Sequence, residues 1–156
     1  MQNLKRDVWV DADSCPVQRE LTAVCSDFKI QPKFIATVNH FKNELNGENW
    51  TFLDHGSQSV DLYILNHVKT ADIVVTQDYS LAVLLTLQGV YVLTPRGKLI
   101  KEEEASDIMN QKHLRQQTMK RKKKWKGPKA FTNNDRDTFS KALHDLLQKN
   151  DEPKGM

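Results

Sequence analysis

Apolar residues along the chain follow two alternating patterns, and this alternation predicts an α/β fold. Short blocks of consecutive apolar residues, rich in Val, Ile and aromatic side chains, are typical of buried strands. These blocks cover residues 8–12, 33–38, 50–54, 72–76, 90–94 and 98–100. Between and after them come segments of helical length or periodicity, at residues 15–28, 60–68, 79–88, 102–124 and 135–148. Strands that alternate with helices form βαβ units, so we expect a mostly parallel sheet covered on both faces.

Local signals predict where individual helices begin and end. Ser14 is a typical N-cap residue and Pro16 follows in the first turn, so the first helix is expected to begin there. Gly89 is expected to end the helix at 79–88. The first helix should present one apolar face to the core, made of Val17, Leu21, Val24, Cys25 and Phe28.

Length and composition favour one domain in a reducing compartment. A chain of 156 residues suits a single core, so we expect one domain over residues 1–150 and a disordered tail at 151–156. No apolar run is long enough to span a membrane, and the first residues lack the apolar core of a signal peptide. With only two cysteines, a disulfide framework is not expected, and a cytoplasmic location follows. The oligomeric state is left open.

Charge is distributed unevenly along the chain. Residues 1–110 hold 10 Lys and Arg against 15 Asp and Glu, a balance of −5, whereas residues 111–156 hold 13 against 5, a balance of +8. Much of the excess lies in a basic helical segment at about 112–126, which contains Lys120, Arg121, Lys122, Lys123, Lys124, Trp125 and Lys126. Such a segment can contact phosphates while the indole stacks on a base. A basic extension on an acidic body suggests a nucleic-acid partner; a solvated helix end is the simpler alternative.

Aspartates gather where the expected strands end. Asp11 and Asp13 close the first strand, Asp78 follows the strand at 72–76, and Asp61 opens the helix that precedes that strand. Carboxyl ends of neighbouring parallel strands meet at one edge of the sheet, where sites of such folds lie. Crowded carboxylates repel one another, which a hard divalent cation such as Mg²⁺ relieves. The alternative is local: Asp13 and Asp61 as helix caps and Asp78 in a turn.

Other candidate groups give weaker signals. Cys15 lies near a helix start, where a thiolate is favoured, but the glycines and the arginine of a thiol-phosphatase loop do not follow. The five histidines have no zinc-like spacing, and neither a Walker A motif nor G-x-G-x-x-G occurs. Arg96 follows a strand within a Thr-Pro-Arg-Gly turn, so it could contact a phosphate at the same edge, or simply be an exposed turn residue.

An ordered set of motifs resembles the YaiI/YqxD family of uncharacterised bacterial proteins. The motifs are WVDADSCPV at 9–17, SVDLYI at 59–64, ADIVVTQDYSLA at 71–82, LTPRGKL at 93–99 and GPKAFTNNDRDTF at 127–139. That family is distantly similar to PIN-like and NYN-like nuclease domains. The resemblance therefore implies a Rossmann-like three-layer sandwich in which acidic residues bind Mg²⁺ or Mn²⁺ for RNA cleavage. It carries over to Asp11, Asp13, Asp61 and Asp78 as catalytic and metal-binding candidates, and to Arg96 and Arg136 as candidates for nucleic-acid contact.

Three functions are compatible with these observations. The first is a metal-dependent ribonuclease, in which the aspartates bind the cation and the basic segment holds the RNA backbone. The second is an RNA-binding protein without catalysis. The third is a phosphatase of the haloacid-dehalogenase kind, with Asp11 as nucleophile and Asp13 as general acid. Cleavage of labelled RNA, binding without cleavage, or release of phosphate from a small ester would distinguish them.

Overall fold

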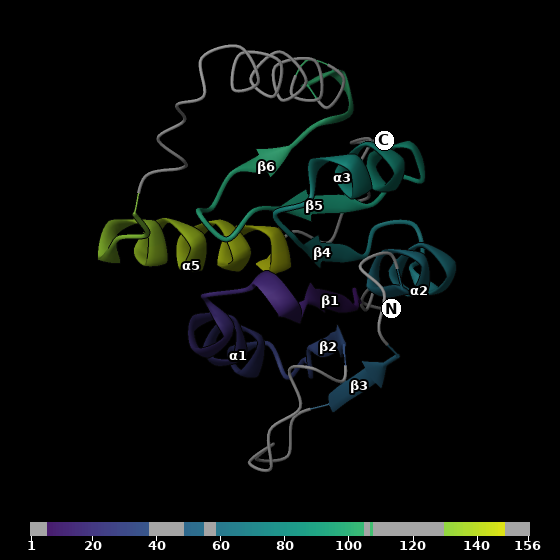
Figure 1. Cartoon of the computed structure of the whole chain (residues 1–156). Coiled ribbons are helices and arrows are strands. Elements are labelled where there is room, and N and C mark those ends of the chain that lie inside the picture. The colour runs from purple at the N-terminus through teal and green to yellow at the C-terminus, as the bar shows by residue number, and fades with distance from the viewer. Residues whose placement is uncertain (1–5, 38–48, 55–58, 105–106, 108–129, 149–156) are drawn as a thin grey trace, which may run out of the picture.

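The expected alternation of strands and helices is confirmed in the computed structural model, which describes residues 6–37, 49–54, 59–104, 107 and 130–148 (Figure 1). The strands are β1 (Val8–Asp11), β2 (Lys33–Thr37), β3 (Asn49–Leu53), β4 (Ile73–Val75), β5 (Tyr91–Leu93) and β6 (Leu99–Ile100). They form one six-stranded sheet in the order β3-β2-β1-β4-β5-β6. All pairings are parallel except that of β5 with β6. The predicted mostly parallel central sheet is therefore present.

Helices cover both faces of this sheet. After β1 come the 3₁₀ turn η1 (Ala12–Ser14) and α1 (Gln18–Asp27); the remaining helices are α2 (Ser59–His67), α3 (Tyr79–Leu87) and α5 (Asn133–Gln148). Figure 1 shows α1 and α5 on one side of the sheet and α2 and α3 on the other. The chain is thus a three-layer α/β/α sandwich, consistent with the expected Rossmann-like architecture. The helix expected at 102–124, its basic segment and the tail at 151–156 lie wholly or mostly outside the described residues.

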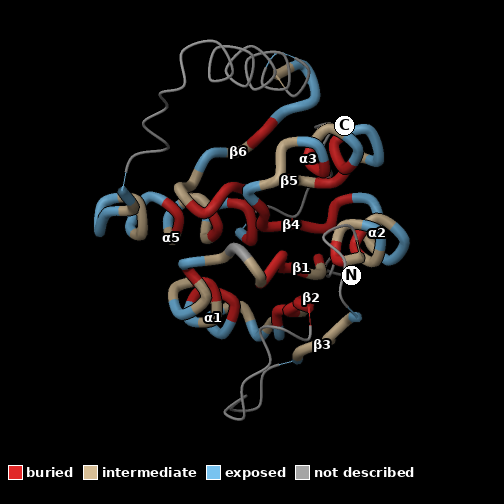
Figure 2. The backbone as a smooth tube through the Cα atoms, in the orientation of Figure 1, coloured by how far each residue is buried: buried red, intermediate tan, exposed pale blue. Residues whose placement is uncertain are grey.

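The alternation of side chains along each strand creates two separate cores. Figure 2 shows that the central strands are buried. Val8 and Val10 of β1 pack with α1 and α5, in a cluster that includes Phe34, Leu21 and Phe139. Trp9, which points to the other face, packs with α2 and α3. Every residue of β1 is buried, so its sequence cannot show a polar face.

The first helix begins later than its sequence signals predict. Ser14 belongs to η1, α1 begins at Gln18, and Val17 at the N-cap position makes no side-chain cap. The cause is Cys15, which precedes Pro16 and is therefore kept out of the helical region; its φ of −112 and ψ of 103 are extended. The expected N-cap at Ser14 is wrong. The expected end of α3 is confirmed, because Gly89 has a φ of +77 and closes the helix.

A buried carboxylate fixes the amino ends of β1 and β4. Asp72 is only 3% exposed and precedes β4 directly. Its oxygens accept hydrogen bonds from the backbone N–H of Asp7 at 3.1 Å, the indole Nε1 of Trp9 at 3.0 Å and the backbone N–H of Lys69 at 2.9 Å. Asp72 thereby sets the register in which the two central strands run side by side.

The turn between β5 and β6 packs closely on the first turns of α5. Gly97 has a φ of +89, and a Cβ atom there would lie 2.8 Å from the backbone of Thr138 and Phe139. Only glycine suits this position, for the conformation and for the space. Two of the motifs that resemble the family, LTPRGKL and GPKAFTNNDRDTF, are thus in direct contact.

We predict that Gly97→Ala lowers the free energy of unfolding by about 2–4 kcal/mol, because a left-handed alanine is strained and its methyl group overlaps helix backbone. Gly89→Ala is the matched control: it also has a positive φ, but its Cβ would meet a movable Thr70 methyl group at 3.2 Å. It should cost about 1–2 kcal/mol. Urea unfolding measures both, and equal losses would contradict the close packing of this turn on α5.

Among the described residues, no helix is both long and apolar enough to cross a membrane.

Candidate functional site

The candidate site lies where the order of the strands reverses. β1 has β2 on one side and β4 on the other, so the chain crosses the sheet between these neighbours. Such a switch point opens a crevice at the carboxyl ends of the strands, where ligands of α/β folds bind. Val10 pairs with Val75, which brings the next residues, Asp11 and Thr76, level with each other. Both follow residues, Val10 and Val75, that belong to the core under α1 and α5.

Asp11 and Asp78 are joined through one threonine. The hydroxyl of Thr76 donates to Oδ2 of Asp11 at 2.9 Å and accepts from the backbone N–H of Asp78 at 3.0 Å. Asp11 is buried, with 9% of its surface exposed. Asp78 is the N-cap of α3, where Oδ1 accepts from the N–H groups of Ser80 and Leu81 at 2.9 and 3.2 Å. Asp78 therefore takes the local capping role and also faces the shared edge.

Asp61 of α2 is the third member of this group. It lies in the first turn of α2, and its pKa is raised from 3.8 to about 7. Partial burial is the main cause, followed by a hydrogen bond to the carboxyl group of Asp78 and by the negative charges of Asp78 and Asp11. Near neutral pH Asp61 is therefore only partly ionised. Three of the four predicted aspartates thus interact electrostatically at the edge of β1 and β4.

Asp13 hydrogen-bonds the neighbouring strand. It belongs to η1, and its carboxylate accepts from the backbone N–H of Thr37 at 3.1 and 3.3 Å and lies 3.5 Å from the Thr37 hydroxyl. Asp13 therefore links the exit of β1 to the end of β2 and does not cap α1. The edge consists of an Asp11–Asp61–Asp78 group, referred to below as the acidic edge, and a neighbouring Asp13–Thr37 contact.

The donor atoms of the acidic edge suit a hard cation, although the side chains are not yet arranged around one. Carboxylate oxygens are the ligands that Mg²⁺ and Mn²⁺ prefer. Within the described part of the chain, no three or more Asp, Glu, His or Cys groups are placed so as to hold a metal ion. Whether these aspartates bind metal stays a prediction.

Cys15 does not behave as a nucleophile. Burial raises the pKa of its thiol to about 12, and the charges of Asp11 and Glu20 act in the same direction, against one backbone hydrogen bond from Val17. A thiol with such a pKa stays protonated at neutral pH. The small-thiol interpretation of Cys15 is supported.

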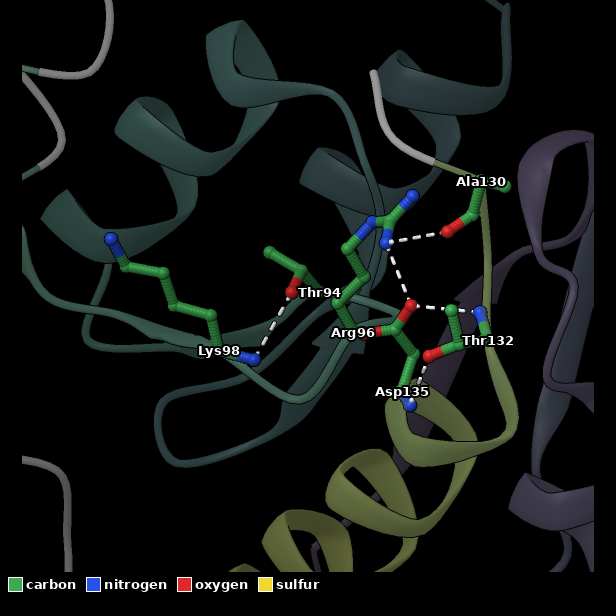
Figure 3. A network of polar contacts seen from close by, with 6 residues as sticks. All are labelled: Thr94, Arg96, Lys98, Ala130, Thr132 and Asp135. Atoms are coloured by element: carbon green, nitrogen blue, oxygen red, sulfur yellow. Dashed lines mark hydrogen bonds and ion pairs between the residues drawn. The ribbon is translucent and has the colours of Figure 1, made fainter.

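The two arginines predicted to meet nucleic acid have structural partners. Nη1 of Arg96 donates to Oδ2 of Asp135 at 2.7 Å and lies 3.5 Å from the carbonyl oxygen of Ala130 (Figure 3). Nη1 of Arg136 donates to the carbonyl oxygen of Pro16 at 2.9 Å and lies 3.4 Å from the carboxylate of Glu20. Both guanidinium groups also face the ring of Phe131, at 5.4 and 5.0 Å from its centroid. Their side chains are 39% and 38% exposed, so a role in binding stays a prediction.

Sequence reasoning missed two threonines at this edge. Thr37 and Thr76 are buried, with 8% and 2% of their surfaces exposed; Thr37 hydrogen-bonds Asp13, and Thr76 hydrogen-bonds both Asp11 and Asp78. The available signal was positional: each threonine follows a run of buried strand residues, and Thr76 precedes Asp78 by two residues. The predicted basic residues 120–126 lie outside the described residues.

Comparison with known proteins gives one family. The family model described as "Uncharacterized BCR, YaiI/YqxD family" matches residues 9–149. The chain is 40% identical over 141 residues to the UPF0178 protein Lmo1456 of Listeria monocytogenes, covering 90% of this chain and 95% of that protein. It is 37% identical over 147 residues to the UPF0178 protein Bcer98_3021 of Bacillus cytotoxicus, covering 94% and 95%. No solved structure matches the chain.

We predict that the acidic edge makes the protein less stable as the pH rises. The pKa of Asp61 is higher in the folded chain, so the folded state binds more protons than the unfolded state between pH 3.8 and about 7. The free energy of unfolding should therefore fall through this window. Asp61→Asn should remove this contribution and be more stable than wild type above pH 7, as measured by urea unfolding at a series of pH values.

The exposed residue Asp137 on α5 provides the control, because Asp137→Asn should leave the pH dependence as it is in wild type. If Asp61→Asn and wild type keep the same slope, Asp61 is not crowded by its neighbours. Millimolar Mg²⁺ should flatten the wild-type slope if the cation binds to Asp61 and so favours its ionised form.

Proposed function

The chain belongs to the YaiI/YqxD family of uncharacterised proteins, and we propose that it is a divalent-metal-dependent nuclease that cleaves RNA at the acidic edge. The observation that carries the proposal is the placement of Asp11, Asp61 and Asp78 together at the β1/β4 switch point, with the pKa of Asp61 raised to about 7. A carboxyl group with a strongly shifted pKa at a switch point is a candidate for a functional role.

Repulsion between crowded carboxylates lowers the stability of the fold. A function that needs these carboxylates would account for their presence at one edge of the sheet. Asp11 and Asp78 are candidates to hold Mg²⁺ or Mn²⁺ directly, and Asp61 and Asp13 to complete the shell or orient water. When bound, such an ion activates water and stabilises the leaving oxygen of a phosphodiester. Within the chain, Asp61 can hold or release one proton near neutral pH, while Asp11 and Asp78 are fixed by hydrogen bonds.

A polyanionic substrate is supported by the basic sequence that precedes Ala130. Lys126 is four residues before Ala130 in sequence. Ala130 lies next to Arg96, which follows β5 at the same sheet edge as the acidic group. A strongly basic sequence thus ends a short length of chain before a residue at this edge, which suits an RNA backbone bound near the aspartates.

Two other functions are weighed against this proposal. RNA binding without cleavage is favoured by the engagement of one Asp78 oxygen in capping α3 and by the lack of a preformed ligand set in the described segments. A phosphatase with Asp13 as general acid is disfavoured, because Asp13 accepts hydrogen bonds from Thr37 where an acid would have to donate. Both alternatives give defined outcomes in the experiments below.

We predict that Asp11→Asn abolishes Mn²⁺-dependent cleavage of a labelled single-stranded RNA while the chain stays folded. Removal of one crowded carboxylate takes away a candidate ligand but relieves repulsion. Asp7→Asn is the matched control, because Asp7 precedes the same strand at the opposite edge, where it pairs with Lys33 at 3.2 Å. It should cut RNA at the wild-type rate. A DNA oligomer of the same sequence tests the preference for RNA.

Cleavage by Asp11→Asn at the wild-type rate would exclude Asp11 from the chemistry. If wild type shifts the RNA in a gel but never shortens it, the binding function replaces the nuclease. Release of phosphate from a small phosphate ester, lost in Asp11→Asn, would instead establish the phosphatase.

We predict that the basic segment controls affinity and not chemistry. In a variant with Lys122, Lys123 and Lys124 all replaced by Ala, nucleic-acid binding should weaken, and the log–log salt slope should fall by about 0.7 per lost contact with a single strand, or about 2 in total. Trp125→Ala should instead cost about 1–3 kcal/mol of binding with a nearly unchanged slope, if the indole stacks on a base. Binding titrations at several salt concentrations decide, and an unchanged slope in the triple variant would show that these lysines do not contact phosphates.

A further inference from the structure

We infer that Thr76 is the positioning residue of the acidic edge: its hydroxyl binds the carboxylate of Asp11 and the backbone N–H of Asp78, and so fixes the end of β1 against the start of α3. The inference rests on the proposed function for its catalytic meaning. Its structural content can be tested without any reaction.

The donor and acceptor roles of the Thr76 hydroxyl are fixed by its two partners. The oxygen accepts from the backbone N–H of Asp78 at 3.0 Å, and a backbone amide can only donate. The single hydroxyl proton is then available to Oδ2 of Asp11 at 2.9 Å. Oδ2 of Asp11 is therefore held as a hydrogen-bond acceptor. Because Thr76 is 2% exposed, water cannot readily replace either bond.

The threonine itself is fixed by the sheet. Its backbone N–H donates to the carbonyl oxygen of Leu93 at 3.2 Å, which ties it to the end of β5, and Val75 before it pairs with Val10 of β1. Through Asp78 the hydroxyl also sets the start of α3, because the carboxylate of Asp78 caps Ser80 and Leu81. One side chain thus connects the end of β1, the end of β4 and the first turn of α3.

Comparison with the other buried threonines at this edge separates positioning from ordinary burial. Thr94 follows β5 as Thr76 follows β4, and it is 6% exposed. Its hydroxyl accepts from the backbone N–H of Lys98 at 3.1 Å and so stabilises the following turn (Figure 3). Thr37 serves Asp13. Thr94 therefore offers a control with the same residue type, burial and strand position but a different partner.

The test compares Thr76→Val, Thr76→Ser and Thr94→Val in the full chain. Valine keeps the shape of threonine and removes the hydroxyl, whereas serine keeps the hydroxyl. Mn²⁺ titration followed by electron paramagnetic resonance should show affinity about 10–100-fold weaker in Thr76→Val, as expected when a hydrogen-bond partner of a metal ligand is removed. Thr76→Ser should recover most of the affinity, and Thr94→Val should match wild type. Equal affinity in Thr76→Val, or an equal loss in Thr94→Val, overturns the inference.

A second measurement needs no metal. Hydrogen exchange of the Asp78 amide and the ¹³C shift of the Asp11 carboxyl group are recorded by nuclear magnetic resonance. Both should change in Thr76→Val, and both should stay near wild type in Thr76→Ser and Thr94→Val. If neither changes in Thr76→Val, Thr76 does not hold these residues.

The two sets of results separate the inference from the proposed function. Wild type that binds Mn²⁺ without cutting RNA refutes the nuclease, while the affinities still decide the role of Thr76. Wild type that binds no Mn²⁺ refutes the metal site, and the resonance measurements then decide whether Thr76 positions Asp11 and Asp78.

Discussion

The pairing of β1 with β4 is the contact on which the candidate site depends. These strands are far apart in the sequence, and a polar group locks them at each end. Asp72 binds the backbone of Asp7 and the indole of Trp9 at the amino edge, and Thr76 binds Asp11 at the carboxyl edge. A shift of the register by one residue would turn every side chain to the opposite face. The same pairing therefore separates the two cores and brings Asp11 to Asp78.

The acidic edge departs from what stability alone would select. Burial and two neighbouring aspartates raise the pKa of Asp61 to about 7, so ionisation at this position opposes folding. The surrounding fold is otherwise locally consistent, since α3 is capped by Asp78 and closed by Gly89. A costly charge cluster within a consistent fold is the pattern expected of a functional site. It sets the acidic edge apart from Asp72, whose buried carboxylate accepts three hydrogen bonds.

The sequence predicted the elements well because each strand is an apolar block with polar flanks. It failed where a neighbour in sequence or in space overrides a local signal. Ser14 has the right chemistry for an N-cap, but the pre-proline Cys15 is extended and delays the helix to Gln18. Asp78 was placed at the edge because it follows a strand. The partners Thr76 and Thr37 were not found, because their bonds depend on the register of strands that meet only in the folded chain.

The β5–β6 turn and the start of α5 are tied to each other and to the exit of β1. Gly97 lets the β5–β6 turn approach the backbone of α5, and Arg96 pairs with Asp135, whose pKa is lowered chiefly by the N–H of Thr132 and also by this arginine. Arg136, whose guanidinium group also faces the ring of Phe131, donates to the carbonyl oxygen of Pro16, just after η1. Residues 130–132 are therefore held between the turn after β5 and the exit of β1. Because the basic sequence ends four residues before Ala130, a polyanion bound by it would, under the proposed function, reach the sheet at the edge where the aspartates lie.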